Sequence, residues 1–95
     1  MLIFHNYLSL TIEGKKMIQE EIENHVITDS RLCGGRPCIR GTRIEIAVIL
    51  DALSEGLSMD EIIDHYPVLK KEDIQAAAAY AAELTRENIW KATVL

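Results

Sequence analysis

The spacing of apolar residues changes along the chain and predicts short strands followed by three helices. From residue 45 onward the apolar positions follow a helical period. In the first such stretch one apolar face is formed by Ile46, Ile49, Leu50 and Leu53. Val48 and Ala52 add apolar surface on a second face, so we expect this helix to be buried on two sides. Gly56 follows it and supplies the left-handed residue that ends many helices.

Ser58 marks the clearest helix start in the chain. Its hydroxyl can accept a hydrogen bond from the backbone three residues on, and Glu61 can return one, which completes a capping box. Pro67 ends this second, short helix, because the residue before a proline is disfavoured in the helical conformation. The side chains expected to face inward are Met59, Ile62, Ile63 and Tyr66.

A third helix is predicted from about Lys70 to about Ile89, although Lys70 is a poor cap. Its narrow apolar face of small side chains, which lets another helix approach closely, is expected to be Ile74, Ala77, Ala78 and Ala81. A short helix, a tight turn at Pro67 and a longer helix together are typical of a helix-turn-helix.

The N-terminal part has a weaker pattern. Leu8, Leu10 and Ile12 alternate with polar residues, which indicates an edge strand that Gly14 and the two lysines after it would end. Residues 1–16 are therefore interpreted as an appendage, and residues 17–95 as a single domain. In that domain, residues 17–23 are expected to form one or two helical turns and residues 25–28 a short strand.

The segment from Cys33 to Ile44 is basic and rich in glycine. Four arginines and no carboxylate lie between Ser30 and Ile44, in a chain of net charge -5. Gly34-Gly35 permits positive φ, and residues 38–39 and 42–44 are interpreted as strand edges around a tight turn, a short β-hairpin. A local basic patch of this kind can bind phosphate or a carboxylate-rich partner. The alternative is a structural hairpin with solvated arginines.

Composition narrows the function classes. With 95 residues and 48% hydrophobic residues the chain is long enough for one small core, and homodimerisation would bury more surface. No run approaches transmembrane length, the N-terminus lacks the features of a signal peptide, and the two cysteines fit a reduced cytoplasm better than a disulfide framework. We therefore expect a cytoplasmic protein with no membrane partner.

Metal binding and catalysis have little support. Cys33 and Cys38 could form a zinc site with His25 or His65, but their spacing is not the usual one and there is no second cysteine pair. The acids near His65 are interpreted as a solvated helix surface, and no serine has a base nearby. We therefore expect no metal, no cofactor and no enzymatic activity.

The motif residues also resemble a known family, the domain of unknown function 433. The matching positions include the run Cys33-Gly34-Gly35-Arg36-Pro37-Cys38-Ile39-Arg40-Gly41-Thr42-Arg43-Ile44, then Val48-Ile49-Leu50, Gly56, Ser58, Glu61-Ile62, Tyr66-Pro67 and Asp73-Ile74-Ala76-Ala77. The resemblance implies a mainly α, small helix-turn-helix domain related to homeodomain-like and winged folds, preceded by the short β-hairpin. It also implies an antitoxin-like role beside a PIN-like nuclease. Two positions depart from the family pattern, since Glu45 stands where the family usually has proline and Lys70 where it has a serine or threonine cap.

These observations lead to the hypothesis of a non-enzymatic antitoxin of a type II toxin–antitoxin pair. It would form a homodimer, inhibit a PIN-like nuclease and bind operator DNA to repress its own transcription. The candidate contacts to DNA or to the partner are Arg36, Arg40, Arg43, Lys70, Lys71 and Gln75. A second candidate surface for the partner is the apolar tail of Ile89, Trp90, Val94 and Leu95. The alternative is a protein-interaction module or homo-oligomer that binds no DNA.

Overall fold

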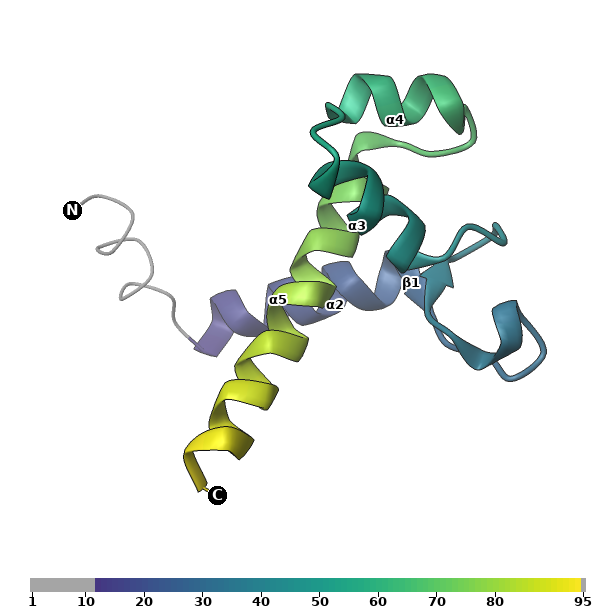
Figure 1. Ribbon diagram of the computed structural model, residues 1–95. Coiled ribbons are helices and arrows are strands. Elements are labelled where there is room, and N and C mark those ends of the chain that lie inside the picture. Colours follow the sequence, from purple (N-terminus) through teal and green to yellow (C-terminus); the bar gives the residue numbers. More distant parts are fainter. Residues whose placement is uncertain (1–11, 95) are drawn as a thin grey trace.

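The computed structural model describes the backbone of residues 12–94 and the side chains of residues 19–86. Within this range the chain is mainly helical, with one small two-stranded sheet (Figure 1). The elements in order are α2 (Ile12–His25), β1 (Val26–Ile27), the 3-10 turn η1 (Cys33–Gly35), β2 (Cys38–Ile39), α3 (Ile46–Ser54), α4 (Met59–His65) and α5 (Lys71–Val94). The expected fold class, a small and mainly α domain with a short hairpin, is confirmed.

The hairpin differs from the expected one in its strand partners. β2 pairs antiparallel with β1, with Val26 opposite Ile39 and Ile27 opposite Cys38. Residues 42–44 form no strand, but the Ile39 N–H donates to the Ile44 carbonyl at 2.9 Å, and one isolated antiparallel bridge joins Cys38 to Glu45. The Thr42 hydroxyl explains this, since it donates to the Ile39 carbonyl at 2.8 Å and accepts from the Ile44 N–H at 3.0 Å. These bonds close a tight turn, beyond which the two segments pair only through the bridge between Cys38 and Glu45.

Helix α2 begins earlier than the apolar pattern predicted. The strand expected around Leu8–Ile12 lies outside the described residues except for Ile12, which is helical. Gly14 does not end a strand but lies inside α2, which continues to His25. The expected turns over residues 17–23 are confirmed as part of this longer helix. Three alternating positions are too few to separate a strand from a helix, and the helix is fixed by packing across α5.

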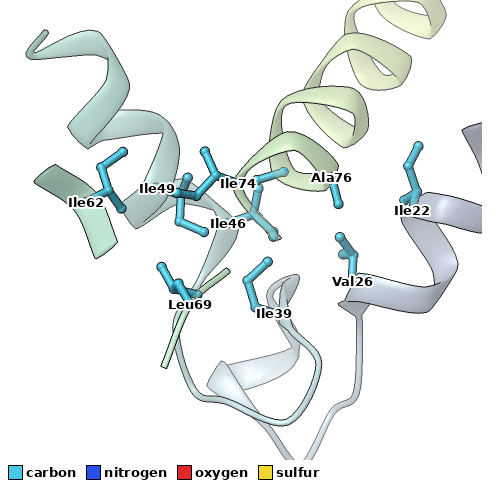
Figure 2. Close-up of a cluster of buried hydrophobic side chains, with 10 residues drawn as sticks. Ile22, Val26, Ile39, Ile46, Ile49, Ile62, Leu69, Ile74 and Ala76 are labelled. Atoms are coloured by element: carbon cyan, nitrogen blue, oxygen red, sulfur yellow. The ribbon is translucent and has the colours of Figure 1, made fainter. Parts of the chain in front are cut away.

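The core is built largely from isoleucines of several elements (Figure 2). The largest fully buried side chains are Ile39, Ile46, Ile49, Ile62, Ile74 and Cys38. They come from β2, α3, α4 and α5, so β2 shares one core with the three C-terminal helices. Ile22 and Val26 extend this cluster to α2 and β1. One continuous core therefore joins the hairpin to the helices.

Helix α3 confirms the predicted inner face and corrects one residue of the second face. Ile46 and Ile49 are buried, whereas Val48 is 36% exposed. Ala52, the other residue of the expected second face, is partly buried and packs against the core, so the correction concerns Val48 alone. Gly56 ends the helix as expected, with φ of 93° and the Leu57 N–H donating to the Ala52 carbonyl at 3.1 Å.

Helix α4 has the predicted capping box. The Ser58 hydroxyl accepts from the Glu61 N–H at 3.1 Å, and the Glu61 carboxylate accepts from the Ser58 N–H at 3.0 Å. Ile62 is buried, but Tyr66 is 38% exposed and does not face inward as expected. Tyr66 is the residue at which α4 ends, with φ of -130°, so the helical period no longer sets its direction.

Helix α5 buries a face shifted from the predicted one. Ile74, Ala76 and Ala77 are buried, whereas Ala78 is exposed. Inward positions at 73, 74, 76 and 77 leave position 78 on the outer side of a helix with 3.6 residues per turn. The small alanines let α2 cross close to α5, whose C-terminal half extends past the crossing (Figure 1). No helix in residues 12–94 has the length and apolar character needed to cross a membrane.

Candidate functional site

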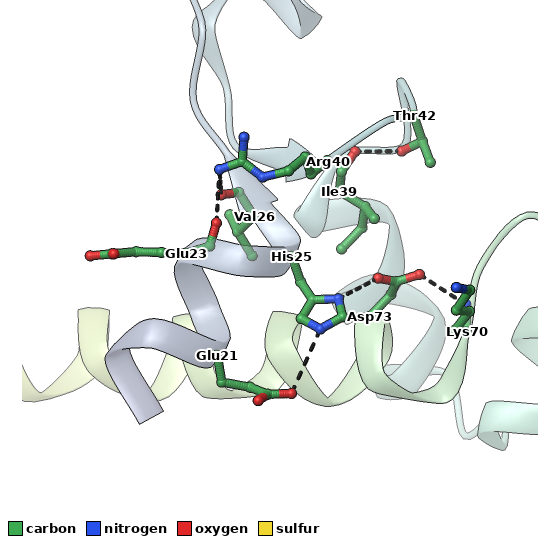
Figure 3. Close-up of polar contacts among 9 residues, drawn as sticks. All are labelled: Glu21, Glu23, His25, Val26, Ile39, Arg40, Thr42, Lys70 and Asp73. Carbon is green, nitrogen blue, oxygen red and sulfur yellow. Dashed lines mark hydrogen bonds and ion pairs between the residues drawn. The ribbon is translucent and has the colours of Figure 1, made fainter. Parts of the chain in front are cut away.

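Arg40 caps the end of α2 and holds the arginine loop, here residues 31–43, against that helix. Its Nη2 donates to the Glu23 carbonyl at 2.8 Å and to the Val26 carbonyl at 3.5 Å, and its backbone N–H donates to the His25 carbonyl at 2.7 Å (Figure 3). The last carbonyls of a helix lack partners within the helix and carry partial negative charge, so a guanidinium stabilises them. Arg40 is thus already bound to the protein itself.

Asp73 joins the start of α5 to the end of α2. It is 8% exposed, and one carboxylate oxygen lies 2.8 Å from Nδ1 of His25. The other oxygen accepts from the Lys70 N–H at 2.9 Å. Because a carboxylate only accepts hydrogen bonds, Nδ1 carries the hydrogen in the first contact. The Lys70 side chain cannot cap α5, because an ammonium group only donates hydrogen bonds. Asp73, three residues on, supplies an acceptor for the backbone N–H at the start of this helix.

A shallow hollow of about 260 Å³ lies between the arginine loop and the turn before α5. Its lining comes from four segments: Asn24 and His25, then Arg40, Gly41 and Thr42, then Val68 and Lys70, and Asp73. Two of the predicted contact residues, Arg40 and Lys70, meet here although thirty positions separate them in the sequence. This hollow is the candidate functional site, hereafter the loop–turn hollow.

Arg36 is paired inside the chain with Glu45, the residue preceding α3. Nε and Nη2 of Arg36 donate to the two carboxylate oxygens at 2.8 and 3.1 Å. This hydrogen bonding holds the pKa of Glu45 below its ordinary value and raises that of Arg36. Arg31 is held in the same way by Asp29, with contacts of 3.1 and 2.9 Å. Planar, two-pronged pairing of this kind orients both side chains.

Arg43 has a different environment from the other arginines of the loop. It is exposed, and within residues 19–86 its contact is through its backbone carbonyl, which accepts from the Cys33 thiol at 3.5 Å. Its guanidinium forms no ion pair or side-chain hydrogen bond with the described side chains. Of the six predicted contact residues, Arg43 and Lys70 therefore have charged groups directed to no acceptor in that part of the chain.

The remaining predicted residues lie apart from the loop–turn hollow. Lys71 lies 3.6 Å from Asp60 of α4, with both side chains largely exposed, and Gln75 is exposed one turn further along α5. Ile89, Trp90 and Val94 belong to α5, but their side chains lie outside the described ones, as does all of Leu95. The structure thus brings Arg40 and Lys70 together, and Arg43 follows Arg40 by three positions. Lys71 and Gln75, on α5, do not line this hollow.

The zinc alternative finds no support in the geometry of the histidines. His25 is bonded to Asp73, and His65 lines a different hollow beside Val48 and Tyr66. Among the described residues, no three side chains of His, Cys, Asp or Glu gather as metal ligands would. Cys38 is buried and Cys33 partly exposed, both as free thiols.

Sequence reasoning missed the role of Asp73, which joins the start of α5 to the end of α2. A local signal was present, because an acid three residues after a helix start can accept from the backbone at that start. Its second partner had no such signal, since His25 lies on another helix. Arg40, expected to face a partner, is likewise fixed by carbonyls distant in the sequence.

The fold and this loop define a small helical domain with a basic hairpin. Comparisons with known proteins identify the family to which this domain belongs. The chain belongs to the DUF433 family, since the family model described as "Protein of unknown function (DUF433)" matches residues 26–81. The crystal structure of a DUF433 member from Anabaena variabilis ATCC 29413 is similar, with a TM-score of 0.60 and 25% sequence identity over 99% of this chain and 95% of that chain.

A curated relative adds sequence similarity over the same region. The uncharacterized protein y4eO of Sinorhizobium fredii (strain NBRC 101917 / NGR234) is 32% identical over 57 residues, which is 59% of this chain. The aligned stretch covers 26% of that relative, so this chain corresponds to a part of it. The family match includes the arginine loop, α3, α4 and the first half of α5.

Proposed function

We propose that this protein is a non-enzymatic, cytoplasmic antitoxin that binds and inhibits a PIN-like nuclease through its arginine loop. The observation that carries the proposal is the contrast among the loop arginines. Arg31, Arg36 and Arg40 are bound to acceptors of the protein itself, whereas Arg43 is exposed and unpaired among the described side chains. Three arginines build the loop, and the fourth is left for a partner.

The chemistry of the partner fits this arrangement. Nucleases of the PIN-like type hold a divalent metal with clustered carboxylates, and a guanidinium can bind a carboxylate through two parallel hydrogen bonds. Arg43 lies on a loop whose backbone is fixed by the Thr42 turn and by the capping of α2, so little backbone entropy is lost when it binds. Lys70, which lines the loop–turn hollow together with Arg40, supplies a second cation for an anionic partner.

Capture of the partner tests this proposal. Tagged wild-type protein, Arg43→Ala and Arg31→Ala are used in parallel to capture proteins from the native cytoplasm. We expect the wild type and Arg31→Ala to retain a PIN-like nuclease and inhibit its RNA cleavage. Arg43→Ala should lose about tenfold or more in affinity, because one charge-assisted contact is removed. Arg31→Ala is the matched control, since it removes an exposed loop arginine already paired with Asp29.

Three results would contradict the proposal in whole or in part. If no nuclease is retained by the wild type, the antitoxin role fails. If a nuclease is retained and inhibited equally by all three proteins, the role stands but the assignment to Arg43 fails. Retention by Arg43→Ala but not by Arg31→Ala would place the contact at the other end of the loop.

Operator DNA binding is a second candidate, supported by the arrangement of α4 and α5. A short helix, a turn and a longer helix bring Lys70, Lys71 and Gln75 to the start of α5, where a recognition helix meets DNA. Of the two acids there, Asp73 is buried and satisfied by His25 and the Lys70 N–H, so Glu72 is the exposed charge that opposes phosphate.

A salt titration separates DNA binding from a purely protein-binding role. Binding to operator DNA should weaken steeply with salt, because each phosphate contact releases counterions. Lys70→Ala should lower the slope by about one unit if this lysine contacts phosphate. Binding that is absent at low salt would favour the protein-interaction module or homo-oligomer. The homodimer itself stays a prediction, which sedimentation of the purified protein would check.

A further inference from the structure

The two cysteines meet against one short stretch of the arginine loop. The Cys33 thiol donates to the Arg43 carbonyl at 3.5 Å, and the Cys38 thiol donates to the Thr42 carbonyl at 3.8 Å. These carbonyls belong to consecutive peptide units, so both thiols are held against the same short stretch of backbone. The pKa of Cys38 lies above its ordinary value, first because the side chain is buried and then because the Cys33 thiol interacts with it.

The backbone between the cysteines is folded back so that the two thiols can approach. Gly34 and Gly35 have φ of 64° and 85°, and the Arg36 N–H donates to the Cys33 carbonyl at 3.1 Å. Cys33 itself has φ of 50°, a value uncommon for a residue with a side chain. This turn reverses the chain between Cys33 and Cys38, whereas an extended segment of that length would hold the thiols far apart.

The two thiols differ in access. Cys38 is 0% exposed and pairs within the sheet, whereas Cys33 is partly exposed on the loop. A reagent in solution therefore reaches Cys33 first. Cys38 can then react only with a group already carried by Cys33. An accessible thiol beside a buried one suits two-step thiol–disulfide exchange. The accessible thiol first forms a mixed disulfide, and the buried thiol then displaces the group that it carries.

We propose that Cys33 and Cys38 form a reversible intrachain disulfide by exchange with a small-molecule disulfide of the glutathione type. The Cys33 thiolate attacks one sulfur of that disulfide, forms a mixed disulfide and releases the first small thiol. The Cys38 thiolate then attacks the Cys33 sulfur, which forms the intrachain bond and releases the second small thiol. Both protein thiols are oxidised, and the small disulfide is reduced to two thiols that take up the two protons.

Disulfide formation would change the part of the loop that carries Arg43. Both sulfurs would no longer donate to the Thr42 and Arg43 carbonyls, which would lose their partners. The new ring would enclose Arg36, whose pair with Glu45 lies at the start of α3. The redox state of this pair thus sets the hydrogen bonding of the exposed arginine. The disulfide itself does not depend on the antitoxin role.

Mass spectrometry under anaerobic conditions tests the proposal directly. The full chain is incubated with oxidised glutathione, quenched with acid and digested. We expect one peptide set in which Cys33 and Cys38 are joined, with the intact protein lighter by two hydrogens. A dithiol reductant should restore the original mass. A chain that stays reduced, or one that is joined to a second chain through Cys33, would overturn the proposal.

Two variants test the order of the steps. Cys38→Ala should accumulate the mixed disulfide at Cys33, because the resolving thiol is missing. Cys33→Ala should stay unmodified, because the remaining thiol is buried. Equal modification of both variants would contradict the assigned order. In the wild type the second step should accelerate about tenfold per pH unit, since the raised pKa of Cys38 leaves little thiolate at neutral pH. A second step insensitive to pH would also contradict it.

Discussion

The arginine loop and the unit formed by α3, α4 and α5 are specified by different forces. In the helical unit, isoleucines from each helix fill a shared core, and polar contacts serve mainly the helix ends. In the loop, Ile39 and Cys38 reach the core, and the rest is held by polar contacts such as Arg36 with Glu45 and Arg40 with the end of α2. Burial stabilises one region without fixing single atoms, whereas hydrogen bonds position individual charged groups in the other.

The largest test of this contrast is a cavity in the helical unit. Ile49 is 0% exposed, so Ile49→Ala should lower the free energy of unfolding by about 3 kcal/mol. Val48, the adjacent residue of α3, is 36% exposed, and Val48→Ala should cost about 0.5 kcal/mol. Urea denaturation measures both. Similar losses would mean that α3 is buried on two sides, for example by a second copy of the chain.

Asp73 tests whether a polar contact can matter as much as the core. Asp73→Ala removes the bond to His25 and the acceptor for the Lys70 N–H, so we expect a loss of about 2 kcal/mol in the free energy of unfolding. Glu72→Ala is the matched control: it removes an exposed acid from the same helical turn and should cost about 0.5 kcal/mol. Equal effects would show that the carboxylates act only through the helix dipole.

Gly41 and Gly56 compare the same backbone requirement in the two regions. Their φ values are 82° and 93°, and a Cβ at either site meets no atom within 4 Å. Gly41→Ala and Gly56→Ala should therefore each cost about 1 kcal/mol, from the backbone conformation alone. Thermal unfolding of both variants measures this. A much larger loss at Gly41 would indicate that the loop needs more than a left-handed residue there.

The smallest expected effect is the acid dependence contributed by Glu45. Its pKa is lowered from 4.5 by the hydrogen bonds and charge of Arg36, so the folded state is stabilised while the carboxyl is ionised. That stabilisation is present above about pH 4.5 and is lost as the pH falls through the lower folded-state value. Arg36→Gln should flatten the decline in stability below this pH, measured by denaturation at several pH values. An unchanged decline would assign it to other acids, such as Asp29 and Glu61, whose pKa values are also lowered.

Helix ends could be predicted well because their signals are local. The capping box at Ser58 and Glu61, the stop at Gly56 and the stop at Pro67 all lie where the sequence predicted them. Inner faces were predicted less well. Tyr66 and Ala78 were expected inside and are exposed, because a period identifies a face only when the helix continues through the residue and its partner is known.

The candidate site could be predicted only in part. The sequence identified the arginine loop as the basic segment, and its composition predicted the turn. It did not distinguish Arg43 from Arg36 and Arg40, because their acceptors are Glu45 and the carbonyls of α2, which become neighbours only on folding. The side chains of the apolar tail lie outside the described residues, so the proposed role of Ile89 and Trp90 stays a prediction.

By itself, the sequence determined the helical character of the C-terminal part, the position of the tight turns and the location of positive charge. Each of these depends on residues within a few positions of one another, where capping, proline and glycine act directly. Tertiary structure alone decided that β2 pairs with β1, that His25 meets Asp73 and that one arginine remains exposed and unpaired among the described side chains. These contacts join distant segments, and only burial of the shared core brings those segments together.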